Sequence, residues 1–185
     1  MQSSELEWCA NAENHLSLRR SGRVPQGIKK KRIQQELEAA ILNGFKDGLQ
    51  IREMDDKGRG VITTREFYKG EFVVEYEGEL VDGKVGKKRD ILYKKDSKIG
   101  CYLYFFKHRD RQYCLDATEE TGKLGRLINH SRNGNLISRV IEVGKPIKPH
   151  LIFLARRDIL KNEELLYDYG DRNPQNIMDH PWLAH

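Results

Sequence analysis

The sequence predicts a mostly β protein with short helices, in which small curved sheets fold around one another. Short β-rich runs separated by glycine-rich turns recur along the chain. They lie at 49–52, 60–64, 72–76, 102–106, 113–115 and 151–155. Helical periodicity interrupts them only once, so a doubly wound sheet, in which strands alternate with helices, is not expected. The two most apolar stretches, 73–76 and 151–155, predict buried strands.

Two helices are predicted. Between residues 30 and 46 apolar residues recur at helical spacing, and they are Ile33, Leu37, Ala40, Ile41 and Leu42. Gly44 and Gly48 mark the end of this N-terminal helix. A second helix is predicted at 86–94, where charged residues face water around Ile91 and Leu92.

Length and composition predict one catalytic unit of ordinary size. A chain of 185 residues can bury a core that needs no disulfide. Its three cysteines, Cys9, Cys101 and Cys114, form no CxxC pair and no Cys/His spacing suited to zinc, so no structural metal is expected. No apolar run has the length of a membrane span, and residues 3–13 lack a signal-peptide core. We expect a soluble intracellular protein with no membrane contact.

Positive charge is concentrated near the N-terminus. The formal net charge is +5 and the pI is near 9.0. Residues 19–32 carry seven basic side chains and no acid, interrupted by Gly22, Pro25 and Gly27. This composition predicts a flexible basic arm that contacts DNA or serves as a nuclear localisation signal. A solvated linker without a partner explains it equally well.

Three segments contain residues typical of a functional site. Residues 56–61 form a glycine-spaced turn that enters a strand, where a ligand could approach the backbone closely, although a plain hairpin turn explains this segment alone. Asn129 and His130 place polar groups after an apolar stretch, where they need hydrogen-bond partners. Tyr167 and Tyr169 fall on one face if their segment is extended. Each pattern by itself is ambiguous.

In combination and in this order, these segments resemble the SET-domain protein lysine methyltransferases. The resemblance rests on 58–60, 75–79, 125–131 and 163–170, and it extends over residues 49–171. Segments 100–106, 113–118 and 180–185, with the basic helix before the domain, are similar to the histone H4 lysine-20 monomethyltransferases within that family. Glu77 departs from the histidine expected there, and 81–86 also diverge.

The resemblance implies a SET-domain fold with a knot-like C-terminal threading, where Asn129 and His130 meet residues 167–170. The domain boundaries follow from it. We expect a flexible basic lead-in at 1–28, an N-flanking helix at 29–48, the SET catalytic domain at 49–171 and a C-terminal flank completing the cofactor site at 172–185.

The resemblance also implies roles for individual residues, with S-adenosylmethionine as the cofactor. Tyr169 is expected beside the transferring methyl group, Tyr76 and Tyr167 along the lysine channel, and Cys101 facing the peptide. The expected cofactor contacts are Lys57, Gly58, Arg59, Tyr102, Arg126, Asn129, His130 and Trp182. A narrow aromatic channel would strip water from the lysine ammonium and so lower its pKa, which methyl transfer requires.

The Tyr167 hydroxyl would restrict the product to monomethyl-lysine by occupying the space that a second methyl needs. The implied partner is the histone H4 tail or a nucleosome, in the nucleus on chromosomes, with the enzyme a monomer. Two alternatives remain: a SET methyltransferase acting on a non-histone protein, and a non-enzymatic chromatin-binding module that uses residues 19–32 and exposed aromatics. The tyrosines at motif positions count against the module.

Overall fold

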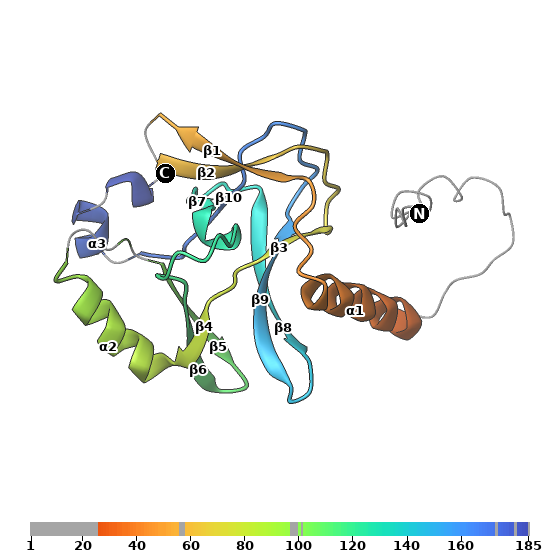
Figure 1. Ribbon diagram of the computed structural model, residues 1–185, viewed down its shortest axis with the longest axis horizontal. Coiled ribbons are helices and arrows are strands. Elements are labelled where there is room, and N and C mark those ends of the chain that lie inside the picture. The colour runs from red at the N-terminus through yellow and green to blue at the C-terminus, as the bar shows by residue number, and fades with distance from the viewer. Residues whose placement is uncertain are drawn as a thin grey trace, which may run out of the picture. The chain divides into compact units, whose positions relative to one another are not determined.

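The computed structural model describes residues 26–55, 58–96, 100, 102–172, 174–179 and 181–184. The chain divides into one unit that ends at Gln35 and a second unit that spans residues 36–185. In the first unit, the described residues form the early turns of helix α1 (Gln26–Leu42). The second unit contains every described strand and the other helices, and it carries the candidate site (Figure 1).

The described strands are short and are joined by turns and brief helices. They are β1 (Leu49–Met54), β2 (Gly58–Thr63), β3 (Phe72–Glu75), β4 (Glu79–Asp82), β5 (Leu103–His108), β6 (Arg111–Asp116), β7 (Asn129–His130), β8 (Leu136–Val143), β9 (Lys148–Ala155) and β10 (Leu166–Tyr167). The later helices are α2 (Gly83–Tyr93), η3 (Gly125–Leu127), α3 (Pro174–Asp179) and η4 (Pro181–Ala184).

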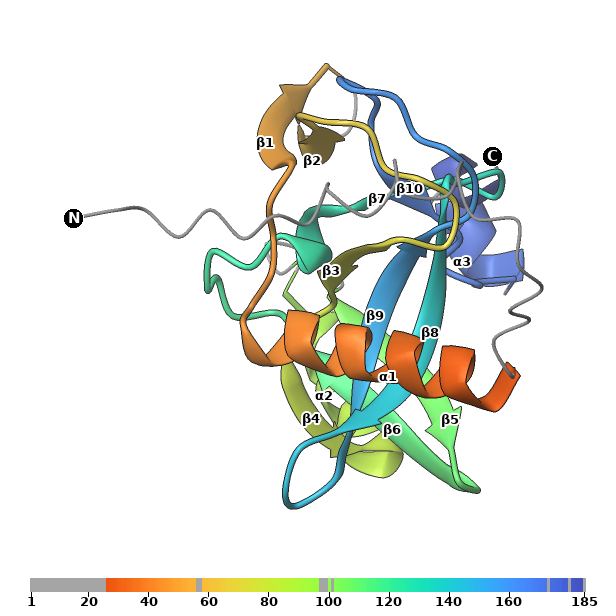
Figure 2. The same cartoon turned by 90° about the vertical axis from the view of Figure 1, so that its right-hand side faces the viewer.

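These strands form four small sheets, which confirms the predicted fold class. The orders are β1-β2, β3-β9-β8, β4-β6-β5 and β10-β7. All of these pairings are antiparallel except β7 with β10. In Figures 1 and 2, the parallel β7–β10 pair lies between the β1–β2 hairpin and the β3-β9-β8 sheet.

Strand β9 separates two parts of the core. Its successive side chains point to opposite faces, so Leu151 and Phe153 pack with Val73 and Tyr167 on one side. On the other side, Ile152 and Leu154 pack against Leu37 and Ile41 from the last turns of α1. Burial on both faces explains why the predicted 151–155 strand is continuously apolar.

Glycine 44 ends α1 earlier than the sequence predicts. Gly44 adopts a φ of 58°, the left-handed conformation that an L side chain rarely tolerates. Its N–H donates to Ile41 at 2.9 Å, and the N–H of Phe45 donates to Ala40 at 2.9 Å. This pair of bonds is a Schellman cap, which satisfies carbonyl groups that the helix leaves without partners. The helix therefore stops at Leu42 and not at Lys46.

The second predicted helix begins three residues earlier than expected. The Asp82 carboxylate accepts the N–H of Lys84 at 2.8 Å and so caps α2 at its N-terminus. Strands β4, β7, β8 and β10 were not predicted as strands. The exposed Ser138 and Arg139 interrupt the apolar pattern of β8, because this strand lies at the edge of its sheet.

No helix in the described part of the chain is long and apolar enough to cross a membrane. The described residues also contain no group of three His, Cys, Asp or Glu side chains that could hold a metal ion.

Gly134 allows β10 to lie against the turn after β7. A Cβ at this position would stand 2.4 Å from the carbonyl oxygen of Leu166 and 2.7 Å from the Cα of Tyr167. We predict that Gly134→Ala lowers the free energy of unfolding by about 1–3 kcal/mol, the usual effect of overpacking, as measured by urea denaturation. Gly27→Ala is the control, since a Cβ there meets nothing within 4 Å. Equal midpoints for the two variants would refute the close packing.

Candidate functional site

The β7–β10 pair brings two of the predicted motifs together. Asn129 lies opposite Leu166, and His130 lies opposite Tyr167. Buried Asn135 reinforces the pair, because its Oδ1 accepts the N–H of Leu166 at 2.9 Å and its Nδ2 donates to the carbonyl of Glu164 at 2.8 Å. One amide side chain thus satisfies backbone groups on both sides of Leu165, so residues 164–166 are held in one position.

Aromatic rings converge beside this pair. Tyr167 lies 4.5 Å from Phe153, 4.6 Å from Tyr169 and 6.0 Å from Tyr104, measured between ring centroids. Tyr104 in turn lies 5.5 Å from Tyr76. Tyr76 and Tyr167 are 4% and 5% exposed, whereas Tyr169 is 36% exposed. The rings therefore run from the core to the surface and end at Tyr169.

Three of the tyrosine hydroxyls in this region are hydrogen-bonded. The hydroxyl of Tyr76 donates to the carbonyl of Tyr102 at 2.9 Å, and that of Tyr169 donates to the carbonyl of Ile128 at 2.9 Å. The Tyr104 hydroxyl bonds the hydroxyl of Ser138 at 2.8 Å, and burial raises the Tyr104 pKa above its ordinary value. All three rings are therefore fixed at both ends, by packing and by a hydrogen bond.

His130 links the aromatic rings to the C-terminal segment. Its Nδ1 accepts the N–H of Tyr169 at 3.1 Å, so the proton of the neutral ring is on Nε2, which lies 3.3 Å from the carbonyl of Leu183 in η4. Burial of the ring lowers the His130 pKa below its ordinary value. Geometry and burial both favour the neutral imidazole.

Arg126 is a buried cation with several partners. Its guanidinium donates to the carbonyl of Ala117 at 2.6 Å, to that of Thr118 at 3.2 Å and to the Glu120 carboxylate at 2.6 Å. The same group lies over the Tyr102 ring, 3.7 Å from its centroid. A buried guanidinium is tolerated when its donors are satisfied in this way. Arg126 therefore holds the Tyr102 ring in place.

Glu120 joins this group to the β2 strand. Its carboxylate also accepts from Arg59 at 2.6 Å, so it bridges two arginines. These hydrogen bonds, from Arg59 first and Arg126 next, lower the Glu120 pKa. Asn129 donates to the carbonyl of Arg59 at 3.4 Å and to the Glu164 carboxylate at 3.1 Å. Residues of the predicted cofactor set thus form one connected group.

Some of the remaining predicted residues lie outside the described part of the chain. Gly58 lies at the β1–β2 turn with a φ of 68°, and an added Cβ would meet nothing within 4 Å, so the turn is open on that side. Lys57 and Cys101 are outside the described residues, as are 19–25 of the basic arm. Trp182 belongs to η4, but its side chain is not described.

Three site residues were not assigned a role by sequence reasoning. Tyr104 could have been found, because it follows Tyr102 by two residues in a β-rich run and so shares its face. Glu120 and Asn135 had no comparable signal. The partners of Glu120 come from segments 61 and 6 residues away in the chain.

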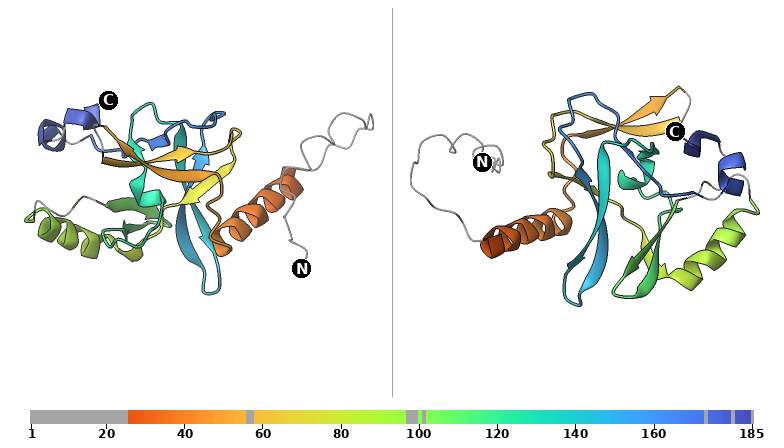
Figure 3. Two further views of the ribbon diagram at one scale, coloured as in Figure 1. Left: turned by 45° about the horizontal axis from the view of Figure 1, so that its top comes forward. Right: turned by 180° about the vertical axis from the view of Figure 1, so that it is seen from behind.

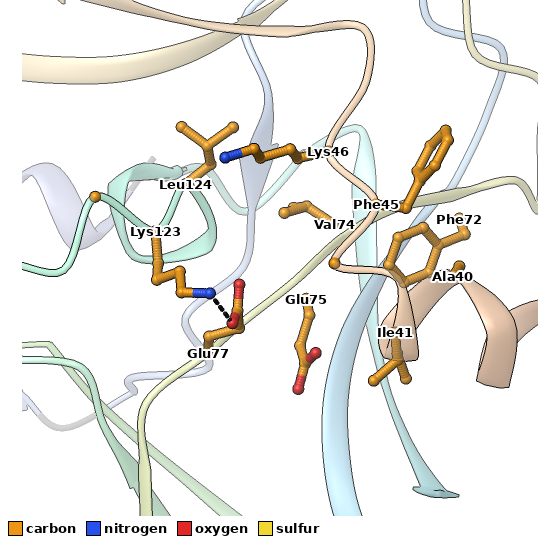
Figure 4. A pocket seen from close by; sticks show the side chains of 12 residues that line it. Ala40, Ile41, Phe45, Lys46, Phe72, Val74, Glu75, Glu77, Lys123 and Leu124 are labelled. Carbon is orange, nitrogen blue, oxygen red and sulfur yellow. Dashed lines mark ion pairs between the residues drawn. The ribbon is translucent and has the colours of Figure 1, made fainter. Parts of the chain in front are cut away.

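A separate small cavity lies between the end of α1 and strand β3 (Figure 4). Glu77, the residue that departs from the family pattern, forms an ion pair there with Lys123. The cavity volume is about 50 Å³, room for a few water molecules. Its lining contains none of the predicted site residues among those described, so it is distinct from the aromatic cluster.

Comparison with known proteins identifies the family of this chain. The SET domain family model matches residues 58–170. The Danio rerio protein N-lysine methyltransferase KMT5A-A is 46% identical over 172 residues, which cover 93% of this chain and 49% of that protein. The Drosophila melanogaster protein Histone-lysine N-methyltransferase Set8 is 49% identical over 167 residues, covering 90% of this chain and 24% of that protein.

The crystal structure of CpSET8 from Cryptosporidium superposes with a TM-score of 0.69 at 40% identity, covering 86% of this chain and 71% of that chain. The present chain spans half or less of the two relatives described above. The family model covers more than half of the chain and includes the β2 turn, the aromatic cluster and the β7–β10 pair. This chain is therefore a member of the SET-domain family.

Proposed function

We propose that this chain carries the catalytic domain of a protein lysine N-methyltransferase that adds one methyl group to a histone H4 tail lysine of the lysine-20 type. The observation that carries the proposal is the meeting of motif segments at β7 and β10, where the tyrosine cluster adjoins the Arg59–Glu120–Arg126 group. The names of the relatives support lysine methylation, and one of them, a histone-lysine methyltransferase, supports a histone substrate.

Methyltransferases of the SET family take their methyl group from S-adenosylmethionine, and the residues present suit that molecule. An open, positive-φ turn at Gly58 allows close approach to the backbone. The ring of Tyr102, fixed over Arg126, offers a flat surface for a nucleoside. We propose that these residues hold the cofactor with Arg59, Asn129 and His130, and that Lys57 and Trp182 complete the site. The bound cofactor would supply an electrophilic methyl group on a positively charged sulfur.

The aromatic cluster would hold the lysine. We propose that Tyr76 and Tyr167 line its channel, with the segment at Cys101 facing the peptide and Tyr169 beside the transferring methyl. Burial of Tyr76 and Tyr167 supports a dry channel, and a dry channel lowers the pKa of an inserted ammonium. The rings can attract the cationic form on entry. His130, by accepting the N–H of Tyr169, would keep that tyrosine oriented.

This activity implies chromatin as the place of action. We propose that the protein works in the nucleus on chromosomal histone H4, as a monomer, and that residues 19–32 assist by contacting DNA. Incubation with labelled S-adenosylmethionine and a choice of free histones, nucleosomes and unrelated proteins tests the substrate. Transfer confined to H4 is expected, and transfer confined to non-histone proteins would contradict it.

We predict that Tyr167→Phe retains methyl transfer and gains dimethyl-lysine as a product. The substitution keeps the ring contacts with Phe153, Tyr104 and Tyr169 and removes only the hydroxyl from the channel. Mass spectrometry of an H4 peptide after exhaustive reaction measures the product.

Tyr104→Phe is the matched control for that variant. It also removes a tyrosine hydroxyl, but the hydroxyl of Tyr104 is hydrogen-bonded to Ser138 and does not point into the proposed lysine channel. Monomethyl product alone is expected from the control. If Tyr167→Phe also stops at monomethyl-lysine, the hydroxyl does not set the product.

We predict that Tyr102→Ala weakens S-adenosylmethionine binding about fivefold or more, since stacking on an aromatic ring contributes roughly 1–3 kcal/mol per base. Tyr102→Phe keeps the ring over Arg126 and should bind within about twofold of the parent. Isothermal titration with the cofactor compares the two. Equal losses in both variants would assign the effect to the hydroxyl, and no loss in either would remove Tyr102 from the site.

A further inference from the structure

Glu120 lies where two separate parts of the proposed cofactor site meet. One oxygen of its carboxylate, Oε2, accepts a hydrogen bond from Arg59 at 2.6 Å and another from Arg126 at 2.6 Å. Arg59 belongs to β2 and Arg126 to η3. Both views of Figure 3 show η3, in teal, beside the orange β1–β2 hairpin. A single carboxylate therefore joins the strand that begins at the open turn to η3.

The two arginines differ in how firmly they are held. The Arg126 side chain is 3% exposed, and it has two further acceptors, the carbonyl groups of Ala117 and Thr118. The Arg59 side chain is 39% exposed, and among the described residues its guanidinium has no hydrogen-bond acceptor other than Glu120. Removal of Glu120 would therefore leave Arg126 in place and release Arg59.

The backbone around Arg59 is part of the proposed cofactor site. Its carbonyl accepts the Nδ2 group of Asn129 at 3.4 Å, and the residue before it, Gly58, forms the open turn. Strand β2 pairs only with β1, in a two-stranded sheet, and a sheet of this size is a weak restraint by itself. The bridge through Glu120 is therefore expected to decide how precisely this turn is placed.

The lysine side of the site is held without Glu120. The carbonyl of Tyr102 accepts the Tyr76 hydroxyl at 2.9 Å and the N–H of Ala117 at 3.0 Å. The ring of Tyr102 lies against Arg126, whose carbonyl acceptors remain when Glu120 is removed. Loss of Glu120 should therefore disturb the binding of the cofactor and leave the proposed lysine channel unchanged.

The bridge contributes little to the stability of the fold. The Glu120 side chain is 51% exposed, and ion pairs at such exposure change the free energy of unfolding only slightly. Hydrogen bonds from Arg59 first and Arg126 next lower the Glu120 pKa, so the carboxylate is ionised at neutral pH. Its effect is local, because it holds together two cations that would otherwise repel each other.

We propose that Glu120 is a positioning residue for S-adenosylmethionine, because it ties Arg59 and the β2 turn to the buried guanidinium of Arg126. A ligand binds more tightly when the groups that contact it are ordered beforehand. Glu120 supplies this order by acting on Arg59, without a contact of its own to the cofactor. The role rests on the proposed function, since it assumes that the β2 turn binds the cofactor.

The test compares two single variants of the full chain. Glu120→Ala removes the bridge, and Glu119→Ala removes the neighbouring exposed carboxylate, which forms no ion pair with a described residue. Isothermal titration measures the dissociation constants of S-adenosylmethionine and of S-adenosylhomocysteine, the reaction product, whose sulfur carries no charge. Thermal melting verifies that both variants are folded.

We expect Glu120→Ala to bind both molecules about fivefold or more weakly, because the ligand itself must then order a long side chain and a turn. In methylation of an H4 peptide, the KM for the cofactor should rise by a similar factor, while kcat and the KM for the peptide stay within about twofold. Glu119→Ala should match the parent within about twofold in each measurement.

Other results would overturn this role. Unchanged binding of both molecules by Glu120→Ala would show that the bridge does not position the cofactor. A loss confined to S-adenosylmethionine would mean that Glu120 attracts the positive sulfur and does not act through Arg59. A fall in kcat with unchanged dissociation constants would show that Glu120 only supports the fold.

Failure of the proposed function gives a different result. If the parent binds the cofactor but does not methylate the H4 peptide, the proposed substrate fails, and the dissociation constants still decide the role of Glu120. If the parent binds neither molecule, the proposed function fails and the role of Glu120 fails with it.

Discussion

The candidate site depends on the parallel pairing of β7 with β10. Each strand is only two residues long, so the ladder cannot hold itself together, and side-chain contacts must supply the rest. Asn135 bonds the backbone on both sides of Leu165, and Gly134 permits the contact that a Cβ would prevent. The paired strands then fix the positions of Tyr167, Tyr169 and His130. A displacement of β10 would separate the tyrosines from the polar residues of β7.

Burial determines the chemistry on either side of this pair. On the aromatic side, rings pack in the core and carry their hydroxyls on specific acceptors, and this combination fixes orientation in a dry environment. On the polar side, the buried cation Arg126 is stabilised by carbonyl groups, the Glu120 carboxylate and the Tyr102 ring. Both sides are therefore held in place by contacts within the chain, and preorganisation of this kind reduces the cost of binding.

On the surface helix α2, charged side chains are arranged differently on the inner and outer faces. Within α2, Arg89 faces inward and is neutralised by Glu79 and Asp116. Exposed Lys84, Lys87 and Lys88 lie in the N-terminal half of the helix, where the helix dipole favours acidic residues. The fold thus tolerates a local loss of helix stability, which the Asp82 cap and the glycine contacts with β6 offset.

From the sequence, short apolar runs predicted the fold class and six of the ten described strands, because such runs report burial directly. The family resemblance came from the ordered motifs. It predicted that Tyr76, Tyr167, Asn129 and His130 belong to one site, because the motifs that contain them follow one another in the order typical of the family. Helix ends were shifted by a few residues, because capping by Gly44 and Asp82 depends on backbone geometry that periodicity does not report.

Which side chains meet across long separations could be learned only from the folded structure. The bridge from Arg59 through Glu120 to Arg126 joins residues up to 67 positions apart, and an exposed glutamate in a loop gives no sign of such partners in the sequence. The same holds for Asn135, whose role follows from the position of Leu166 31 residues later. The apolar pattern of a local segment predicts its burial, whereas polar partners depend on how distant segments are brought together. The fold could therefore be predicted from the sequence, and the polar network could not.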